Sequence, residues 1–233
     1  MDLVSKQRAE RRQRILDVAR RLIAERGYEG VTMRELADES LVSVPTLYNL
    51  FGGKSELLFA AVELYFRNLL SQADQSGDEE GLHKVLAVCE TLGASMPRHA
   101  EYARSLMTFF GGTQESTKLR EFVARELTNE LVVALEQMQA KKQLVAWVDP
   151  VALGERLATL MIMTSFEWAA HHLSDRSLNS AMLFGAAAVI HGFARGKAAG
   201  EVEQIVRDQQ ANAVVPRALG PDERRAANVD ESS

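Results

Sequence analysis

The stretch TMRELADESLVSVPTLYNLF, residues 32–51, decides the fold, because it reads as two short helices joined by a tight turn. Thr32 and Glu35 form a T-x-x-E pattern, which predicts a capping box in which each side chain satisfies a free backbone N–H at a helix start. The second helix is expected to begin near Ser43 and to end before the two glycines at 52 and 53. In a helix-turn-helix, the second helix enters the DNA major groove while the first crosses the backbone. The stretch therefore predicts a DNA-reading head.

The predicted groove helix, residues 43–50, has one apolar face and one face of small, hydroxyl and amide side chains. The apolar face is expected to close the core of the head with Leu36, Val42, Leu47, Leu50 and Phe51. Tyr48 beside Asn49 on the outward face is unusual, because Lys or Glu is typical where a helix meets only water. Hydroxyl groups, helix N-termini and ammonium groups contact phosphates, and the other outward side chains can meet base edges. We expect phosphate contacts from Thr32, Ser43, Tyr48 and Lys54, and base contacts from Val44, Pro45, Thr46 and Asn49.

Positive charge is concentrated near the N-terminus. Residues 1–60 hold ten Lys and Arg against nine Asp and Glu, whereas the remainder holds 17 against 23, for a formal net charge of −5. Residues 6–14 alone carry five positive charges and one Glu. A basic segment on an acidic body fits a protein that touches phosphates at one end. A solvated helix start is the alternative interpretation.

Helical periodicity dominates the whole chain, so the fold class is expected to be all-α. Gly27 should end the first long helix, and Asp149-Pro150 should open another, with Asp149 as its cap. The organisation expected is a three-helix head over residues 1–53, a larger helical body over 54–211 and a disordered tail over 212–233. The helices predicted for the body are 54–72, 82–95, 98–110, 116–139, 150–172, 177–195 and 202–210.

The composition limits the class of protein. Cys89 is the one cysteine, which excludes an intramolecular disulfide and a Cys-rich metal site and suits a reducing cytosol. The N-terminal residues are charged and lack the apolar core of a signal peptide, and no segment approaches 18 uninterrupted apolar residues. A cytoplasmic protein without a membrane partner is expected.

A basic first helix with ILDVARRLIAERGYEGVTMRELADE, then VS-x-x-TLY-x-x-F, then Lys54 and Glu56-Leu57-Leu58 follow one another within residues 8–66. Together they resemble the DNA-binding domain of TetR/AcrR-family transcriptional regulators. The resemblance implies a dimeric, ligand-responsive repressor with a small-molecule pocket in its C-terminal body. By position, it also implies DNA contacts at Thr32, Ser43, Thr46, Tyr48, Asn49 and Lys54. Beyond residue 66 the resemblance is one of layout only.

Three positions depart from the family's pattern. Leu41 stands where the family usually has a turn glycine, and a positive φ there costs a leucine about 1 kcal/mol. Val44-Pro45 replaces a commoner Lys or Ser followed by a small residue, and Asn49 replaces a commoner His. The base-facing set also contains no Arg or Lys to grip guanine, so we expect specificity to rest on apolar contacts and DNA shape.

The body offers candidates for an effector pocket, because several methionines lie beside aromatic residues and would suit an adaptable apolar cavity. The predicted pocket residues are Leu86, Cys89, Met96, Tyr102, Leu106, Phe109, Phe110, Phe122, Met161, Met163 and Phe166. Plain core packing is the alternative for each of them. Charged residues are scarce in this set, so a largely apolar or aromatic small-molecule effector is expected.

Two late helices carry the prediction of a homodimer. In residues 181–196 the small residues Gly185, Ala188 and Gly192 share one face, which allows close helix approach. The helix before it carries a stripe of Leu153, Leu157, Leu160, Thr164 and Trp168. A two-fold protein also matches a palindromic double-stranded DNA operator. The alternative is that both stripes belong to the core of one chain.

Catalytic and metal-binding signals are weak. Glu167 and His171 stand four residues apart, but the chain has no H-E-x-x-H and no third ligand at a persuasive spacing. Cys89 lies in an apolar stretch that favours inert core over a redox sensor. The sequence therefore predicts a transcriptional regulator that is not an enzyme and has no cofactor or metal. An all-α enzyme or protein-interaction scaffold without DNA binding is the alternative.

Overall fold

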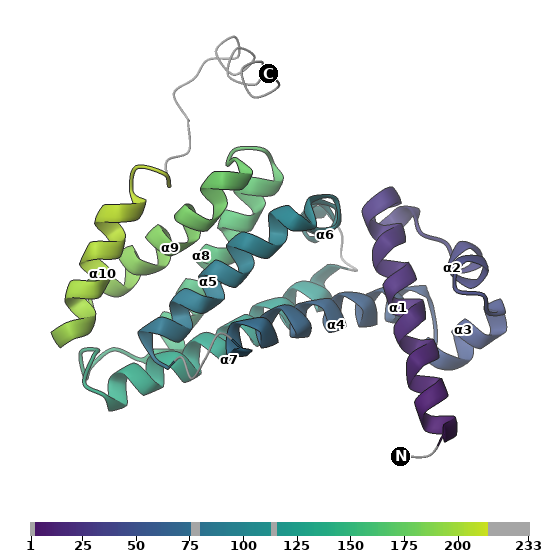
Figure 1. Ribbon diagram of the computed structural model, residues 1–233, viewed down its shortest axis with the longest axis horizontal. Helices are drawn as coiled ribbons and strands as arrows, with labels where there is room; N and C mark the ends of the chain where they lie inside the picture. The colour runs from purple at the N-terminus through teal and green to yellow at the C-terminus, as the bar shows by residue number, and fades with distance from the viewer. Residues whose placement is uncertain (1–2, 76–79, 113–115, 214–233) are drawn as a thin grey trace, which may run out of the picture.

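The computed structural model describes residues 3–75, 80–112 and 116–213, and these residues form ten α-helices (Figure 1). The helices are α1 (Leu3–Gly30), α2 (Met33–Glu39), α3 (Val44–Phe51), α4 (Lys54–Gln75), α5 (Leu82–Arg98), α6 (Ala100–Gly112), α7 (Ser116–Ala140), α8 (Pro150–Ala169), α9 (Asp175–His191) and α10 (Gly196–Gln209). The predicted all-α class is confirmed. Helices α1 to α3 form a head at one end of the molecule, and α4 runs from that head into a body of six further helices.

The two helices of the head begin as their sequence predicts. Thr32 caps α2, and its hydroxyl accepts from the backbone N–H of Glu35 while the Glu35 carboxylate accepts from the backbone N–H of Thr32. Ser43 caps α3, and its hydroxyl accepts from the backbone N–H of Thr46. Gly27 leaves helical geometry at φ 73°, which kinks the end of α1 where a stop was expected.

The head closes over a small apolar core. Ile15, Leu22, Ile23, Leu36 and Leu47 are almost completely buried there. At about 25 cal/mol for each Å² of apolar surface removed from water, such contacts dominate the stability of a three-helix unit.

Cations of α1 tie the other two helices of the head to it. Arg12 donates to the backbone carbonyl of Leu50 at the end of α3 and stacks over the Phe51 ring at 4.4 Å. Arg21 donates to Glu39 at the end of α2 at 2.8 Å. Part of the basic charge near the N-terminus therefore stabilises the head.

Most helices of the body agree with the predicted spans to within a few residues. Asp149 caps α8, and its carboxylate accepts from the backbone N–H of Val151. The prediction that Pro97 lies between two helices is wrong, because α5 continues through Pro97 and ends at Arg98, one residue later. The last helix begins earlier than expected, at Gly196. The predicted tail falls almost entirely outside the described residues.

Two close helix approaches fix the packing of the body. A side-chain carbon added to Gly93 of α5 would lie 2.6 Å from the Cα of Asn179 in α9. One added to Gly154 of α8 would lie 2.8 Å from a methyl group of Val132 in α7. Within the described ranges, no helix combines the length and the apolar character needed to cross a bilayer.

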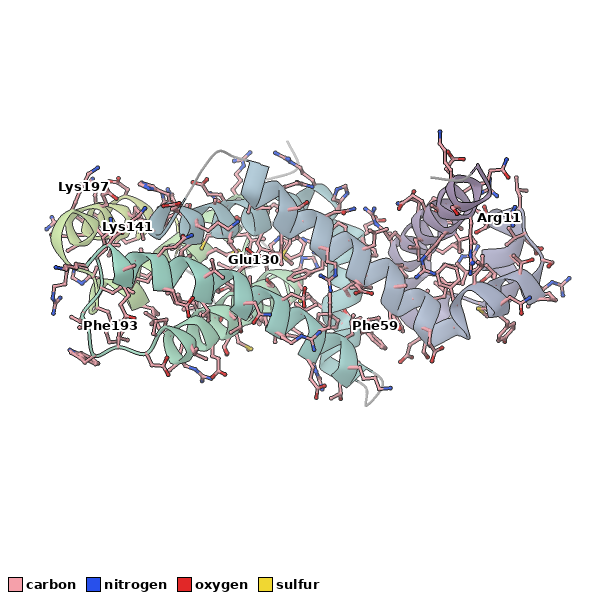
Figure 2. All side chains as sticks on the ribbon, turned by 90° about the horizontal axis from the view of Figure 1, so that it is seen from below. Arg11, Phe59, Glu130, Lys141, Phe193 and Lys197 are labelled. Atoms are coloured by element: carbon pink, nitrogen blue, oxygen red, sulfur yellow. The ribbon has the colours of Figure 1, made fainter. Side chains whose placement is uncertain are left out.

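The head and the body meet through α1 and α6. Tyr28 near the end of α1 stacks on Phe109 of α6, with 3.7 Å between the ring centroids. Figure 2 shows the two parts from below, with Arg11 at the head end and Lys197 at the far end of the body. The predicted domain boundary between residues 53 and 54 coincides with the start of α4, and it stays a prediction because α1 packs on the body.

Candidate functional site

The predicted DNA-contacting residues lie on one exposed surface at the turn between α2 and α3 and along α3. Thr32, Ser43, Pro45, Tyr48 and Asn49 are exposed, and the Tyr48 side chain is 51% exposed. The remaining three residues, Val44, Thr46 and Lys54, are half-buried. Val44 packs partly against the head core, so a smaller part of its surface is available than the sequence suggests.

Two hydroxyl groups lie together at the start of α3. The oxygens of Ser43 and Thr46 lie 2.8 Å apart and share one hydrogen bond. Each hydroxyl can donate one proton, so one of the two O–H groups stays available for an acceptor on DNA. At the same helix start, Pro45 has no backbone N–H and the Thr46 N–H is bonded to Ser43, so the helix itself offers an anion little beyond the N–H of Val44.

Lys54 has a role within the head that the sequence did not reveal. Its ammonium donates to the backbone carbonyl of Glu29, at the end of α1, over 2.8 Å. A cation at a helix C-terminus stabilises the helix dipole. An ammonium has three donors, so two donors of Lys54 remain for a phosphate.

Leu41 occupies the turn between α2 and α3 with φ 54°, and its side chain is 83% exposed. The sequence identified this position as one that usually holds a turn glycine. The turn therefore keeps the left-handed conformation, and the leucine carries the strain. An exposed leucine beside the reading helix also adds apolar surface to the predicted DNA face.

Sequence reasoning did not assign several cations of the head individually. Arg8, Arg11, Arg14 and Arg34 are exposed and form no salt bridge within the described part of the chain. Arg34 lies in the first turn of α2, two residues from the Thr32 cap. The positive charge of Arg34, so close in sequence to the predicted phosphate contact Thr32, was the signal that could have identified it as a further contact.

The body contains a cavity of about 230 Å³ that lies between five helices. Its wall is almost entirely apolar and comes from α4, α5, α6, α7 and α8. The lining residues are Val62, Tyr65, Phe66, Leu69, Leu92, Met96, Ala103, Leu106, Met107, Phe110, Arg120, Val123, Ala124, Leu127, Met161, Ile162 and Ser165.

The cavity includes some of the predicted pocket residues and leaves others elsewhere. Met96, Leu106, Phe110 and Met161 line it. Others of the set lie outside its wall: Cys89, Tyr102, Phe109 and Phe122 are buried in the core, and Leu86 and Phe166 are partly buried against it. Met163 points outward and is 54% exposed. Helical spacing could not separate these groups, because core and cavity walls use the same residue types.

Three residues of the cavity wall carry polar side-chain atoms. The Ser165 hydroxyl donates to the backbone carbonyl of Met161 in its own helix, over 2.8 Å. Arg120, which is exposed, donates to the backbone carbonyl of Phe110 and to the Thr117 hydroxyl. The Tyr65 hydroxyl is buried and has no hydrogen-bond partner among the described residues.

The predicted dimer residues divide into inner and outer positions. Leu153, Leu157, Thr164 and Trp168 are buried within the single chain. Leu160 contacts Gly185, where an added side-chain carbon would lie 2.8 Å from a Leu160 methyl group. Ala188 of α9 and Gly192, which caps the C-terminus of α9, are exposed. The prediction of an interface on α8 and α9 stays a prediction, and its exposed part differs from the stripe read from the sequence.

The remaining candidates are structural. Burial raises the pKa of the Cys89 thiol well above its usual range, which opposes the thiolate that redox sensing requires. His171 is exposed at the end of α8 with φ 59°. Across residues 3–75, 80–112 and 116–213, no group of three or more His, Cys, Asp and Glu side chains could hold a metal ion.

Comparisons with known proteins agree with the geometry of the head. The sequence model of the family described as bacterial regulatory proteins, tetR family, matches residues 15–61. The transcriptional regulator BetI of Brucella anthropi is 30% identical over 138 residues, which cover 57% of this chain and 71% of that protein.

Solved structures extend the similarity over the body. A TetR-family regulator from a Rhodococcus species superposes with a TM-score of 0.63 at 24% identity, covering 78% of this chain and 99% of that one. FadR of Thermus thermophilus, a TetR-family repressor solved with lauroyl-CoA, gives a TM-score of 0.56 at 18% identity, covering 90% and 98%. The chain therefore belongs to the TetR family of bacterial regulatory proteins, and it is a DNA-binding transcriptional regulator.

Proposed function

We propose that this protein is a homodimeric repressor that leaves a palindromic operator when a small, largely apolar molecule enters the cavity of its body. The observation that carries the proposal is the apolar cavity of the body, which lies beside α6, the helix that contacts the head. The two sites would be coupled because a ligand that binds one conformation better than another shifts their populations.

In the DNA-binding part of the proposal, Thr32, Ser43, Tyr48 and Lys54 contact phosphates, and a second set of residues contacts bases. Exposure of Tyr48 and Asn49 on α3 supports their contact with DNA. The base-reading residues would be Val44, Pro45, Thr46 and Asn49. We add Arg34 to the phosphate contacts, because its exposed guanidinium lies beside Thr32.

The effector is proposed to have a long apolar part with an acidic end. A volume of about 230 Å³ is smaller than the 300–1,000 Å³ typical of pockets for drug-sized ligands, so it suits the apolar part alone. The exposed guanidinium of Arg120 at the cavity wall would hold the acidic group near solvent. The lauroyl-CoA in the FadR structure has this character.

The homodimer is proposed to form through the outer faces of α8 and α9. Ala188 and Gly192 expose little side chain there, which permits close approach of a second copy. Val151 and Met163 of α8 are about half exposed, at 48% and 54%, and would add apolar contact. Two heads related by a two-fold axis would then read two halves of a palindrome.

Helix α6 is proposed to transmit the signal, together with α4. Leu106 and Phe110 of α6 line the cavity, whereas Tyr102 and Phe109 contact residues of α1. Any ligand that displaces α6 must therefore repack the contact between body and head. Helix α4 supplies the direct covalent connection, since it begins at Lys54 and lines the cavity at Val62.

A gel-shift experiment with the full-length protein tests this function. Genomic fragments that the protein retains at physiological salt would identify an operator, and added lauroyl-CoA or dodecanoate should release it. A variant with Tyr48→Ala and Lys54→Ala should lose binding, whereas Lys197→Ala on the far body should keep it. Retention that is independent of salt, or equal retention by both variants, would contradict the proposed DNA face.

A protein-interaction scaffold or an all-α enzyme is not favoured. The relatives reported above are transcriptional regulators, and the DNA face and the cavity both have roles within a regulator.

A further inference from the structure

One end of the cavity adjoins a cluster of three polar side chains, each of which has a buried atom without a hydrogen-bond partner among the described residues. Arg20 of α1, Tyr65 of α4 and Tyr102 of α6 form this cluster. The Arg20 guanidinium lies 4.8 Å from the centroid of the Tyr65 ring and 5.8 Å from that of Tyr102. The two tyrosine rings meet edge to face, with their centroids 5.0 Å apart.

Three polar atoms of this cluster are buried and unpaired among the described residues. They are the Nε of Arg20 and the hydroxyl oxygens of Tyr65 and Tyr102. A buried polar group without a partner is destabilising, so such groups are rare in folded proteins and mark places that water or a ligand completes. Tyr102 is only 4% exposed, and Tyr65 is the member that lines the cavity.

The phenols of this cluster are suited to donate hydrogen bonds. Burial raises the pKa of Tyr65 and of Tyr102, which keeps both hydroxyls protonated. The positive charge of Arg20 over the Tyr65 ring opposes that rise, which makes the phenol a stronger donor than burial alone would. A hydrogen-bond acceptor is therefore the complement of this end of the cavity.

The acceptor should be neutral. Asp17 lies 3.7 Å from Arg20 and offsets part of the guanidinium charge. Transfer of a carboxylate into this apolar wall would carry a large desolvation cost that the single phenol of Tyr65 cannot offset. A carbonyl or ester oxygen accepts the same hydrogen bond at a much smaller cost.

The opposite end of the cavity has different chemistry. Arg120 donates to the backbone carbonyl of Phe110 near the end of α6, whereas Tyr65 contacts Tyr102 near its start. Eight residues of α6 separate these two points, which is about 12 Å at 1.5 Å per residue. At one end the wall presents the exposed guanidinium of Arg120, and at the other it presents the buried phenol of Tyr65.

We propose that the effector is an elongated apolar acid with a second, neutral hydrogen-bond acceptor at the end remote from its acidic group, and that Tyr65 receives this acceptor. The inference rests on the proposed function, in which the cavity holds the effector. It adds the orientation of the ligand and a chemical requirement at its buried end. It also places the buried end beside Arg20, so that occupancy is felt directly by a residue of the head.

A pair of acids with equal chain length tests the requirement. Monomethyl decanedioate and dodecanoate both have twelve chain atoms and one carboxylate, but only the first has an ester carbonyl near its far end. Isothermal titration of the full-length protein should show about three- to tenfold tighter binding of the monoester, which is the size expected for one hydrogen bond. Equal affinities, or tighter binding of dodecanoate, would overturn the proposal.

Variants at each end of the cavity locate the interaction. Tyr65→Phe should remove the preference for the monoester while leaving dodecanoate binding almost unchanged. Arg120→Gln should weaken both acids by the same factor and keep the preference. Tyr48→Phe, which removes an exposed phenol on the DNA face, should change neither affinity. A preference that survives in Tyr65→Phe would show that another group receives the ester and would overturn the assignment.

Failure of the proposed function has a separate outcome. If neither acid binds the wild-type protein, the cavity is not a site for apolar acids. Both the proposed effector class and the proposed orientation of the ligand are then refuted. If both acids bind and release DNA with equal potency, the effector class stands and only the Tyr65 subsite is refuted. Circular dichroism of each variant, compared with the wild type, verifies that the body stays folded.

Discussion

Replacement of Lys54 by methionine tests two roles of this residue, one observed in the structure and one proposed. Its ammonium donates to the carbonyl of Glu29 over 2.8 Å, at the C-terminus of α1, and it is also a proposed phosphate contact. A cation at a helix end contributes about 0.3–1 kcal/mol. Methionine keeps the length and apolar stem but removes the charge, so Lys54→Met should lower the free energy of unfolding by about that amount.

The effect of Lys54→Met on DNA binding should be larger and of a different kind. Each phosphate neutralised contributes about −0.9 to the slope of log affinity against log salt concentration. Two heads of a dimer each lose one contact, so the slope should become less steep by about 1.8. When the salt concentration rises from 50 to 200 mM, the fold-decrease in DNA affinity should be about twelve times smaller for the variant than for the wild type.

Fluorescence anisotropy with a labelled duplex, measured at four or more salt concentrations, gives this slope directly. The control is Lys197→Met, because Lys197 is a strongly exposed lysine at the far end of the body and should leave the slope unchanged (Figure 2). A slope of Lys54→Met equal to that of the wild type, with a lower unfolding free energy, would refute the phosphate contact and leave only the helix-capping role. A slope change in both variants would show that the charge of the whole protein, and not the DNA face, sets the salt dependence.

Three further predictions concern the cap, the body packing and the cavity. Thr32→Ala should lower the free energy of unfolding in urea by about 1 kcal/mol through loss of the capping box. Hydrogen bonds from Thr32 hold the pKa of Glu35 below its usual range, so the Glu35 contribution is present above an unfolded pKa of about 4.3 and is lost as pH falls through the lower folded value. Thr32→Ala should therefore flatten the acid limb of a stability–pH curve, and an unchanged limb would count against the cap. Gly93→Ala should destabilise the protein by about 1–3 kcal/mol, because its new carbon would lie 2.6 Å from Asn179, whereas Gly200→Ala in open space should be stabilising in the same melting experiment. Ala124→Leu should fill part of the cavity, so that operator binding in a gel shift persists but added acid no longer releases the DNA; normal release would place the effector elsewhere.

The local signals of the head were predictable from sequence because each rests on short-range chemistry. The Thr32–Glu35 box, the Ser43 cap and the left-handed Leu41 turn depend on residues within a few positions of one another. The assignment of individual DNA contacts was harder. Lys54 contacts a carbonyl 25 residues away, and no local pattern reports such a partner.

The cavity and the dimer face were less predictable for a physical reason. A helix in a multi-layer bundle has two or three apolar sides, and periodicity shows only that a side is covered. Trp168 illustrates the problem. Its indole N–H donates to Asp175 over 2.7 Å, and Arg104 stacks on its ring. Both of these partners belong to the same chain, so Trp168 needs no second subunit to bury it. A stripe that suggested an interface was therefore largely occupied by the core of its own subunit.

The joint between head and body limits how strongly an effector can act on DNA. Tyr28 stacks on Phe109, and Arg20 stacks on two tyrosines, so a change of α6 has to break or remake contacts worth about 0.5–1.5 kcal/mol for an aromatic pair and a similar amount for a cation on a ring. Coupling energies of 1–3 kcal/mol, which correspond to about 5- to 150-fold changes in affinity, are typical of allosteric proteins. A few such contacts in each subunit are therefore sufficient for regulation, and no large rearrangement is required. Because coupling is reciprocal, DNA bound to the head must weaken effector binding by the same factor by which the effector weakens DNA binding.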